Sequence, residues 1–187
     1  MAWHPERRTG NDETVNIPAI STDIYWDTPP IWREAQANLN HLLFLRVPRG
    51  NFILNLAETI SNRISSLEPL LANLCMQTCP DCTNPCCKQA TVRYDFRDLI
   101  LLHLQQKGLP LFQPKPDPGR QCYMLGEKGC TLARYMRPFM CTWYLCPGQM
   151  DLVRSTTSGY INRLPKHLRE IQDKRKELET NFLQLVS

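Results

Sequence analysis

The sequence predicts a mainly α-helical fold in which an irregular cysteine-rich centre is packed between helices, with little or no β-sheet. Two observations lead to this prediction. Apolar residues recur at helical spacing in several separate stretches, and all nine cysteines lie between Cys75 and Cys146. Four prolines in residues 109–121 predict a surface loop between the two cysteine groups. We expect one compact domain overall.

The first part of the chain, residues 1–50, is predicted to be an N-terminal arm with a short helix. Prolines such as Pro18, Pro29 and Pro30 interrupt any apolar periodicity there. Several tryptophans and a tyrosine lie in or beside the arm, which favours packing against the body or against a partner over free disorder.

Residues 51–74 form a predicted helical segment. Apolar residues follow Asn51 at helical spacing, and Asn51 suits the N-cap position. We expect Ser66 to cap a second, short helix, because Pro69 is tolerated only in a first turn.

Residues 75–148 are predicted to be a cysteine-cluster metal-binding domain. They include one strongly apolar helix from Phe96 to Lys107, with Asp95 as its N-cap and Asp98 in its first turn, and this should be the most buried helix.

Residues 149–187 are predicted to supply a C-terminal helix with an apolar stripe from Leu164 onward. Arg175 interrupts this stripe, which predicts that part of it lies at the solvent edge or against a partner.

Charge and hydropathy narrow the possible functions. The net charge of +4 is too mild to indicate nucleic-acid binding, and no recognition helix is apparent. The sequence contains no stretch of about eighteen apolar residues, so it predicts no membrane span. The first residues lack the apolar run of a secretory signal. We therefore expect a cytoplasmic protein, in which a dense cysteine pattern favours metal binding or catalysis over disulfides.

The cysteines form two groups whose spacing suits metal ligation. A C-x-x-C turn from Cys79 to Cys82 can bring two thiolates onto one ion. The adjacent Cys86 and Cys87 point to opposite sides if the segment is extended, so they serve different sites, or one ligates while the other packs. Eight thiols suffice for about two four-ligand sites, and one site with spare or redox-active thiols is the alternative. The predicted metal ligands are Cys79, Cys82, Cys86, Cys87, Cys122, Cys130, Cys141 and Cys146.

This order of residues resembles a known family. Residues 75–148 are similar to the YkgJ-like cysteine cluster proteins, which are zinc- or iron-chelating and share the CxxCxxxCC motif. The resemblance rests on Cys79-x-x-Cys82-x-x-x-Cys86-Cys87, then Cys122, Gly129-Cys130, Arg137-Pro138-x-x-Cys141 and Cys146. Cys75 lies outside the family pattern and is interpreted as a small buried hydrophobic residue.

Arg137 lies between two predicted ligands, and we expect it to bind at the cofactor. It would donate hydrogen bonds to a thiolate or to carbonyl groups of the cluster loops.

Three functions follow from these patterns. The first is a metal-binding protein that holds zinc or a 4Fe-4S iron-sulfur cluster at one or two sites, with a structural or redox role; both cofactors accept four thiolates. The second, which the resemblance implies, is an iron-sulfur oxidoreductase or a metal-dependent transferase, since some members of the YkgJ-like family are iron-sulfur oxidoreductases or occur in a flagellin lysine methylase. The third is an assembly or maturation factor that binds a protein partner through the N-terminal aromatic arm or the C-terminal helix.

Overall fold

Helices dominate the chain, as the sequence predicts. The structure, a computed structural model, describes residues 26, 28–48, 51–80, 82–83, 85–106, 108, 110–114, 121–126, 129–156, 159 and 161–187. The α-helices of this part are α1 Pro29–Arg46, α2 Phe52–Ser66, α3 Glu68–Thr78, α4 Cys86–Gln89, α5 Phe96–Leu104, α6 Met140–Trp143, α7 Pro147–Ser155 and α8 Leu164–Val186. Two 3-10 helices, η1 Arg134–Met136 and η2 Ile161–Arg163, join them.

The β-structure of the described residues is very small. Strands β1 Leu125–Gly126 and β2 Gly129–Cys130 form one antiparallel pair, in which Leu125 faces Cys130. The prediction of little or no β-sheet is confirmed.

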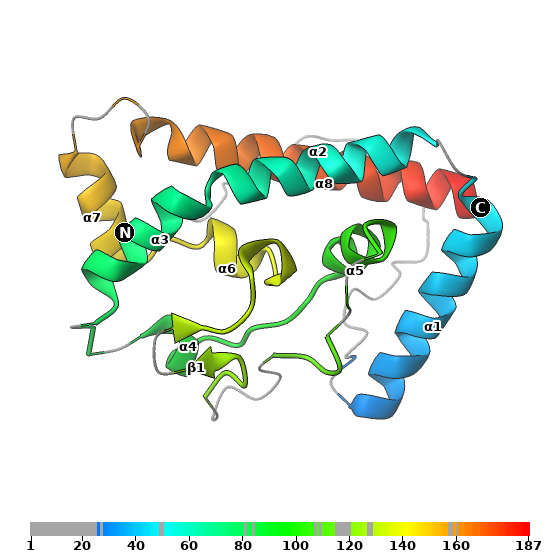
Figure 1. Cartoon of the computed structure of the whole chain (residues 1–187), viewed down its shortest axis with the longest axis horizontal. Helices are drawn as coiled ribbons and strands as arrows, with labels where there is room; N and C mark the ends of the chain where they lie inside the picture. The colour runs from blue at the N-terminus through cyan, green and yellow to red at the C-terminus, as the bar shows by residue number, and fades with distance from the viewer. Residues whose placement is uncertain are drawn as a thin grey trace, which may run out of the picture.

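The long helices α2 and α8 lie side by side, and α5 packs against both of them (Figure 1). Helix α1 closes one end of the molecule, while α3 and α7 pack together at the other end. The segments that carry α4, β1 and α6 lie on the same side of α2 as α5 does. Within the described residues, no helix combines the length and the apolar character that crossing a membrane requires.

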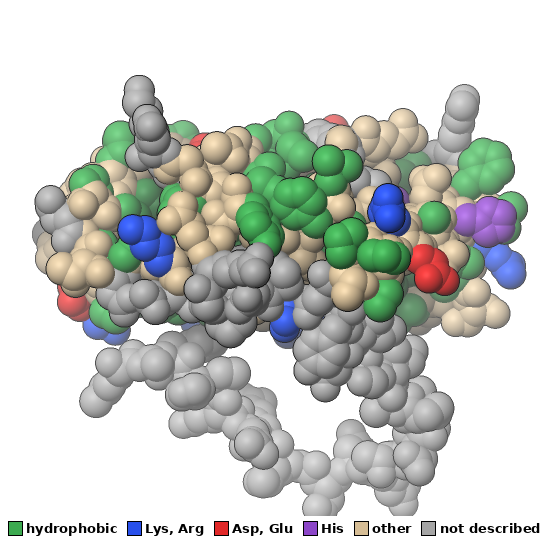
Figure 2. All heavy atoms as spheres, turned by 90° about the horizontal axis from the view of Figure 1, so that it is seen from below, with side chains coloured by type: hydrophobic (Ala, Val, Ile, Leu, Met, Phe, Trp, Pro, Cys, Tyr) green, Lys and Arg blue, Asp and Glu red, His purple; other side chains and the backbone are tan. Residues whose placement is uncertain are grey.

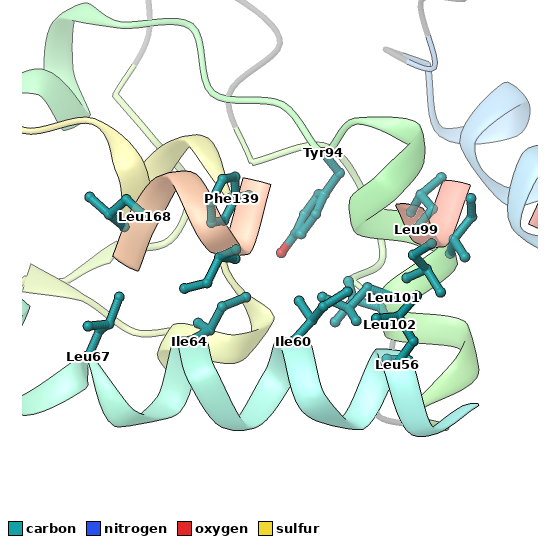
Figure 3. Close-up of a cluster of buried hydrophobic side chains, with 14 of the residues drawn as sticks. Leu56, Ile60, Ile64, Leu67, Tyr94, Leu99, Leu101, Leu102, Phe139 and Leu168 are labelled. Carbon is teal, nitrogen blue, oxygen red and sulfur yellow. The ribbon is translucent and has the colours of Figure 1, made fainter. Parts of the chain in front are cut away.

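The core forms where the apolar faces of α2, α5 and α8 meet (Figure 3). Ile60 and Ile64 of α2 are almost fully buried and point toward the side chains of the facing helices. Burial of each such side chain contributes about 1.5–3 kcal/mol relative to exposure. The apolar residues at helical spacing after Asn51 therefore form the buried face of α2.

Two predicted helix starts are confirmed by their hydrogen bonds. The Asn51 side chain accepts a hydrogen bond from the backbone N–H of Ile53 at the start of α2. Asp95 and Asp98 form a reciprocal capping box at the start of α5. Each satisfies backbone N–H groups that the first turn of a helix leaves without partners.

The predicted cap at Ser66 is wrong. Ser66 is the last residue of α2, and its hydroxyl donates to the carbonyl of Arg63. The next helix begins after Leu67, which is 2% exposed and keeps a right-handed helical backbone. Burial of the Leu67 side chain thus decides where α2 ends and α3 begins. Helix α3 continues past the predicted segment boundary at residue 74 and includes Cys75.

Helix α1 is longer than the short helix predicted for the arm, with 18 residues. Its two prolines start the helix instead of interrupting it, since the first turn does not need their missing N–H groups. Trp32 is fully buried, and its indole N–H donates to the carbonyl of Pro110 at 2.9 Å. This part of the arm packs against the body, whereas residues 1–25 lie outside the described residues.

The C-terminal part differs from the prediction in two ways. It contains α7 in addition to the predicted helix, which is α8. Arg175 does not mark a solvent edge or a partner surface, because its side chain is 2% exposed and ion-paired inside the chain. A cationic residue can occupy a buried stripe when carboxylates meet it there.

Candidate metal centre

All nine cysteines lie in the described part of the chain, and none of them forms a disulfide. Different elements carry them, and several of these elements lie close together in Figure 1. Cys75 is in α3, Cys79 ends α3, Cys82 follows in a turn, Cys86 and Cys87 begin α4, Cys122 precedes β1, Cys130 ends β2, Cys141 is in α6 and Cys146 is the N-cap of α7.

Three other thiols influence the pKa of Cys87. The adjacent Cys86 thiol is the largest cause of the raised pKa of Cys87, followed by burial. The charges of Cys141 and Cys122 raise it further. The backbone N–H of Cys122 also donates to the carbonyl of Cys87 at 3.1 Å. Because like charges shift a pKa strongly only over short distances, these thiols of both sequence groups are near one another.

Cys141 links Cys130 to these thiols. Burial raises the pKa of Cys141 to about 12, and the charges of Cys130, Cys122 and Cys86 add to the effect. We call these five residues the Cys87 group; its members are Cys86, Cys87, Cys122, Cys130 and Cys141.

A second set of thiols lies at the end of α3. Burial, and then the charge of Cys75, raise the pKa of Cys79 to about 11. Cys82 follows in a turn that its backbone N–H closes on the carbonyl of Cys79 at 3.2 Å. Cys86 also contributes to the raised pKa of Cys79, so the two sets are neighbours.

The thiols are close together, but they are not arranged as a finished ion site. In the part of the chain that the structure describes, no three His, Cys, Asp or Glu side chains form a group that could hold a metal ion. Thiols with raised pKa values are neutral near pH 7, whereas a bound cation strongly favours their thiolates. Metal binding would therefore draw the sulfur atoms closer together.

The buried hydroxyl of Thr142, next to Cys141 in the sequence, could bond to a group bound at this site. The hydroxyl of Thr142 is almost fully buried, at 1% exposure of the residue, and has no hydrogen-bond partner among the described residues. Leaving such a hydroxyl unpaired costs about 1–3 kcal/mol. A bound ion, cluster or ordered water would remove this cost.

The arginines between Cys130 and Cys141 hold the loop that joins them. Arg137 donates from Nε to the carbonyl of Leu132 at 2.8 Å, and its expected part at a cofactor stays a prediction. Arg134 is 5% exposed, pairs with Glu68 of α3 and lies 3.5 Å from the carbonyl oxygen of Cys141. Sequence spacing does not indicate this pair, because Glu68 is distant from Arg134 along the chain.

A buried ion pair anchors the segment before Cys141 to the helices. Arg175 of α8 donates to Asp98 at 2.5 Å and to Asp95 at 2.8 Å. Asp98 also accepts a hydrogen bond from the backbone N–H of Phe139 at 3.1 Å, and the Arg175 guanidinium carbon lies 4.3 Å from the centre of the Phe139 ring. The sequence explained Asp98 by capping alone, and its second role depends on contacts across the fold.

The carboxyl group of Asp98 makes stability depend on pH. Burial raises its pKa from 3.8 to about 7, although Arg175 opposes the shift. The folded state then binds a proton more readily than the unfolded state, so this group's contribution to the free energy of unfolding falls as the pH rises from about 4 to about 7. We expect the Asp98→Asn variant to lack this fall.

Urea unfolding of both proteins between about pH 5 and about pH 7 checks this, because only the difference in slope against pH is compared. Equal slopes in the two proteins would contradict the shift.

Comparisons with family models, with curated proteins and with solved structures find no match to this chain. The resemblance to the YkgJ-like family therefore stays a prediction that rests on the cysteine and Arg-Pro pattern.

Proposed function

We propose that this protein binds metal through cysteine thiolates and holds zinc or a 4Fe-4S iron-sulfur cluster in a structural or redox role. The observation that supports this most directly is the hydrogen bond of 3.1 Å from the backbone N–H of Cys122 to the carbonyl of Cys87, which brings the two cysteine groups of the sequence together. Thiolates from separate loops that converge on one ion are the usual construction of structural metal sites. Nine cysteines without a disulfide fit a reducing compartment such as the cytoplasm.

The distribution of the core also supports a metal. The main cluster of buried hydrophobic residues includes no described residue between Leu104 and Phe139. This stretch carries Cys122 and Cys130, and among its described residues the large side chains of Leu111 and Tyr123 are exposed instead of buried. Segments that lack their own core depend on disulfides or metals for stability, and none of the nine cysteines forms a disulfide.

Arg137 has a supporting part in this proposal. Its bond to the carbonyl of Leu132 fixes the loop between Cys130 and Cys141. Arg137 is thus a positioning residue for two ligands, and residues of this kind orient the ligands and tune the metal.

Metal content tests the proposal. We expect protein purified without oxygen to contain at least one equivalent of zinc or one cluster per chain, because four thiolates satisfy either. The Cys87→Ser variant should lose at least half of this metal, since Cys87 is at the middle of the Cys87 group. Atomic emission measures both metals, and a brown colour bleached by dithionite distinguishes a cluster from zinc.

The matched control is Met76→Ser, which removes a sulfur atom from an exposed side chain of α3 and leaves every thiol in place. It should retain the wild-type metal content. Wild-type protein with less than about half an equivalent of zinc and iron together would refute the proposed function.

A further inference from the structure

Cys75, which the family pattern leaves out, makes polar contacts that a small hydrophobic residue does not need. The side-chain amide of Gln149 in α7 donates to the Cys75 sulfur at 3.5 Å. Gln149 is 7% exposed, so this N–H is directed at sulfur inside the protein. Buried amide N–H groups that donate to sulfur are typical of the surroundings of metal-bound thiolates.

The same glutamine connects Cys75 to Cys146. Its Oε1 atom accepts the backbone N–H of Cys146 at 3.3 Å, while its own backbone N–H is bonded to the Cys146 sulfur in a capping box. Cys146 is the N-cap of a nine-residue helix, where the positive end of the helix dipole favours a thiolate. A single buried side chain thus holds two cysteines that lie far apart in the sequence.

Cys75 also has thiol neighbours on its own helix. Cys79 follows it by one helical turn, so the two side chains lie on the same face of the helix. The backbone N–H of Cys79 donates to the carbonyl of Cys75 at 2.8 Å, and the turn that follows brings Cys82 back to Cys79. Three cysteines therefore lie along the end of α3, beside the helix that begins with Cys146.

We propose that Cys75, Cys79, Cys82 and Cys146 bind one metal ion at the junction of α3 and α7, with Gln149 as its positioning residue. We call this the α3–α7 site. The Cys87 group, with five thiols, binds the other metal. This inference rests on the proposed function and adds Cys75 to the eight predicted metal ligands. Binding would bring each sulfur to about 2.3 Å from a zinc ion.

Zinc titration tests the inference. Chelator-treated protein is titrated with Zn²⁺ alone, and bound zinc is counted per chain. We expect two equivalents for the wild type and one for Cys75→Ser, because the α3–α7 site loses a ligand. Gln149→Leu keeps every thiol, and it should weaken binding at one of the two sites by about 10- to 100-fold.

The matched control is Leu74→Ala, which truncates the buried neighbour of Cys75 on the same helix. It destabilises the core but should still bind two zinc ions. A Cys75→Ser variant that binds as much zinc as the wild type, with equal affinity, would overturn the α3–α7 site while the proposed function stands. A wild type that takes up neither zinc nor iron would instead overturn the proposed function.

Alkylation of the wild type covers the case in which Cys75→Ser does not fold. Iodoacetamide should modify Cys75 at least about tenfold more slowly with bound zinc than after chelation, as the thiolate is the reactive form and the ion occupies it. Mass spectrometry locates the modified residue. Equal rates with and without zinc would overturn the assignment of Cys75.

Discussion

Chelation of the metal should unfold the loops around the cysteines while α2, α5 and α8 remain helical. Structural zinc contributes about 10–16 kcal/mol of folding free energy in small zinc-binding domains, which is more than the stability of most domains. No described residue of the loops between Leu104 and Phe139 belongs to the main apolar core, so we expect these loops to depend on this contribution. Hydrogen exchange followed by mass spectrometry, before and after chelation, measures the loss of protection segment by segment.

The Cys87→Ser variant is a useful comparison for this experiment, since without chelator it should resemble the chelated wild type in the same loops. Protection should return to the wild type when zinc or iron is restored. The prediction fails if the amides of residues 121–138 exchange at the same rate with and without metal. We do not expect α5 to lose protection, because it belongs to the hydrophobic core.

Replacement of Arg175 by leucine should lower the free energy of unfolding by about 3–5 kcal/mol. The change would leave Asp98, which is 5% exposed, without its cationic partner inside the protein. It would also remove the cation that lies over the Phe139 ring, on the segment that leads to Cys141. Urea unfolding of the metal-loaded protein at about pH 8, above the pKa of Asp98, measures the loss.

Two further variants separate the ion pair from general effects. Lys176→Ala removes an exposed cation from the next position of α8 and should change stability by less than about 0.5 kcal/mol. In the double variant Arg175→Leu with Asp98→Leu, no charge of this pair remains buried, so part of the lost stability should return. If Arg175→Leu alone were as stable as the wild type, the pair would not stabilise this fold.

Much of the helical structure could be predicted because its causes are local. The N-cap at Asn51 and the capping box of Asp95 and Asp98 depend on residues within one turn of each other, and both are confirmed. Ser66 has the right side chain for a cap but does not serve as one. The burial of Leu67 decides that join, and burial depends on helices from elsewhere in the chain.

In the candidate site, too, the sequence indicates local features but not contacts between distant residues. The spacing of the cysteines and the bond of Arg137 to a loop carbonyl involve residues close in sequence, and the sequence indicated both. The contact of Arg134 with Glu68 and that of Gln149 with Cys75 join residues more than sixty positions apart. No local pattern predicts such pairs, because the packing of α3 against its neighbours creates them.

The amino-acid order was sufficient to indicate a helical chain with a thiol-rich middle, since helical periodicity, capping and cysteine spacing act over a few residues. It did not indicate that Arg175 is buried, or that Cys75 lies with the other thiols. Both depend on which surfaces meet when α3, α5, α7 and α8 pack. A charge or a thiol takes its role from the groups that face it, and the fold brings those groups from distant positions.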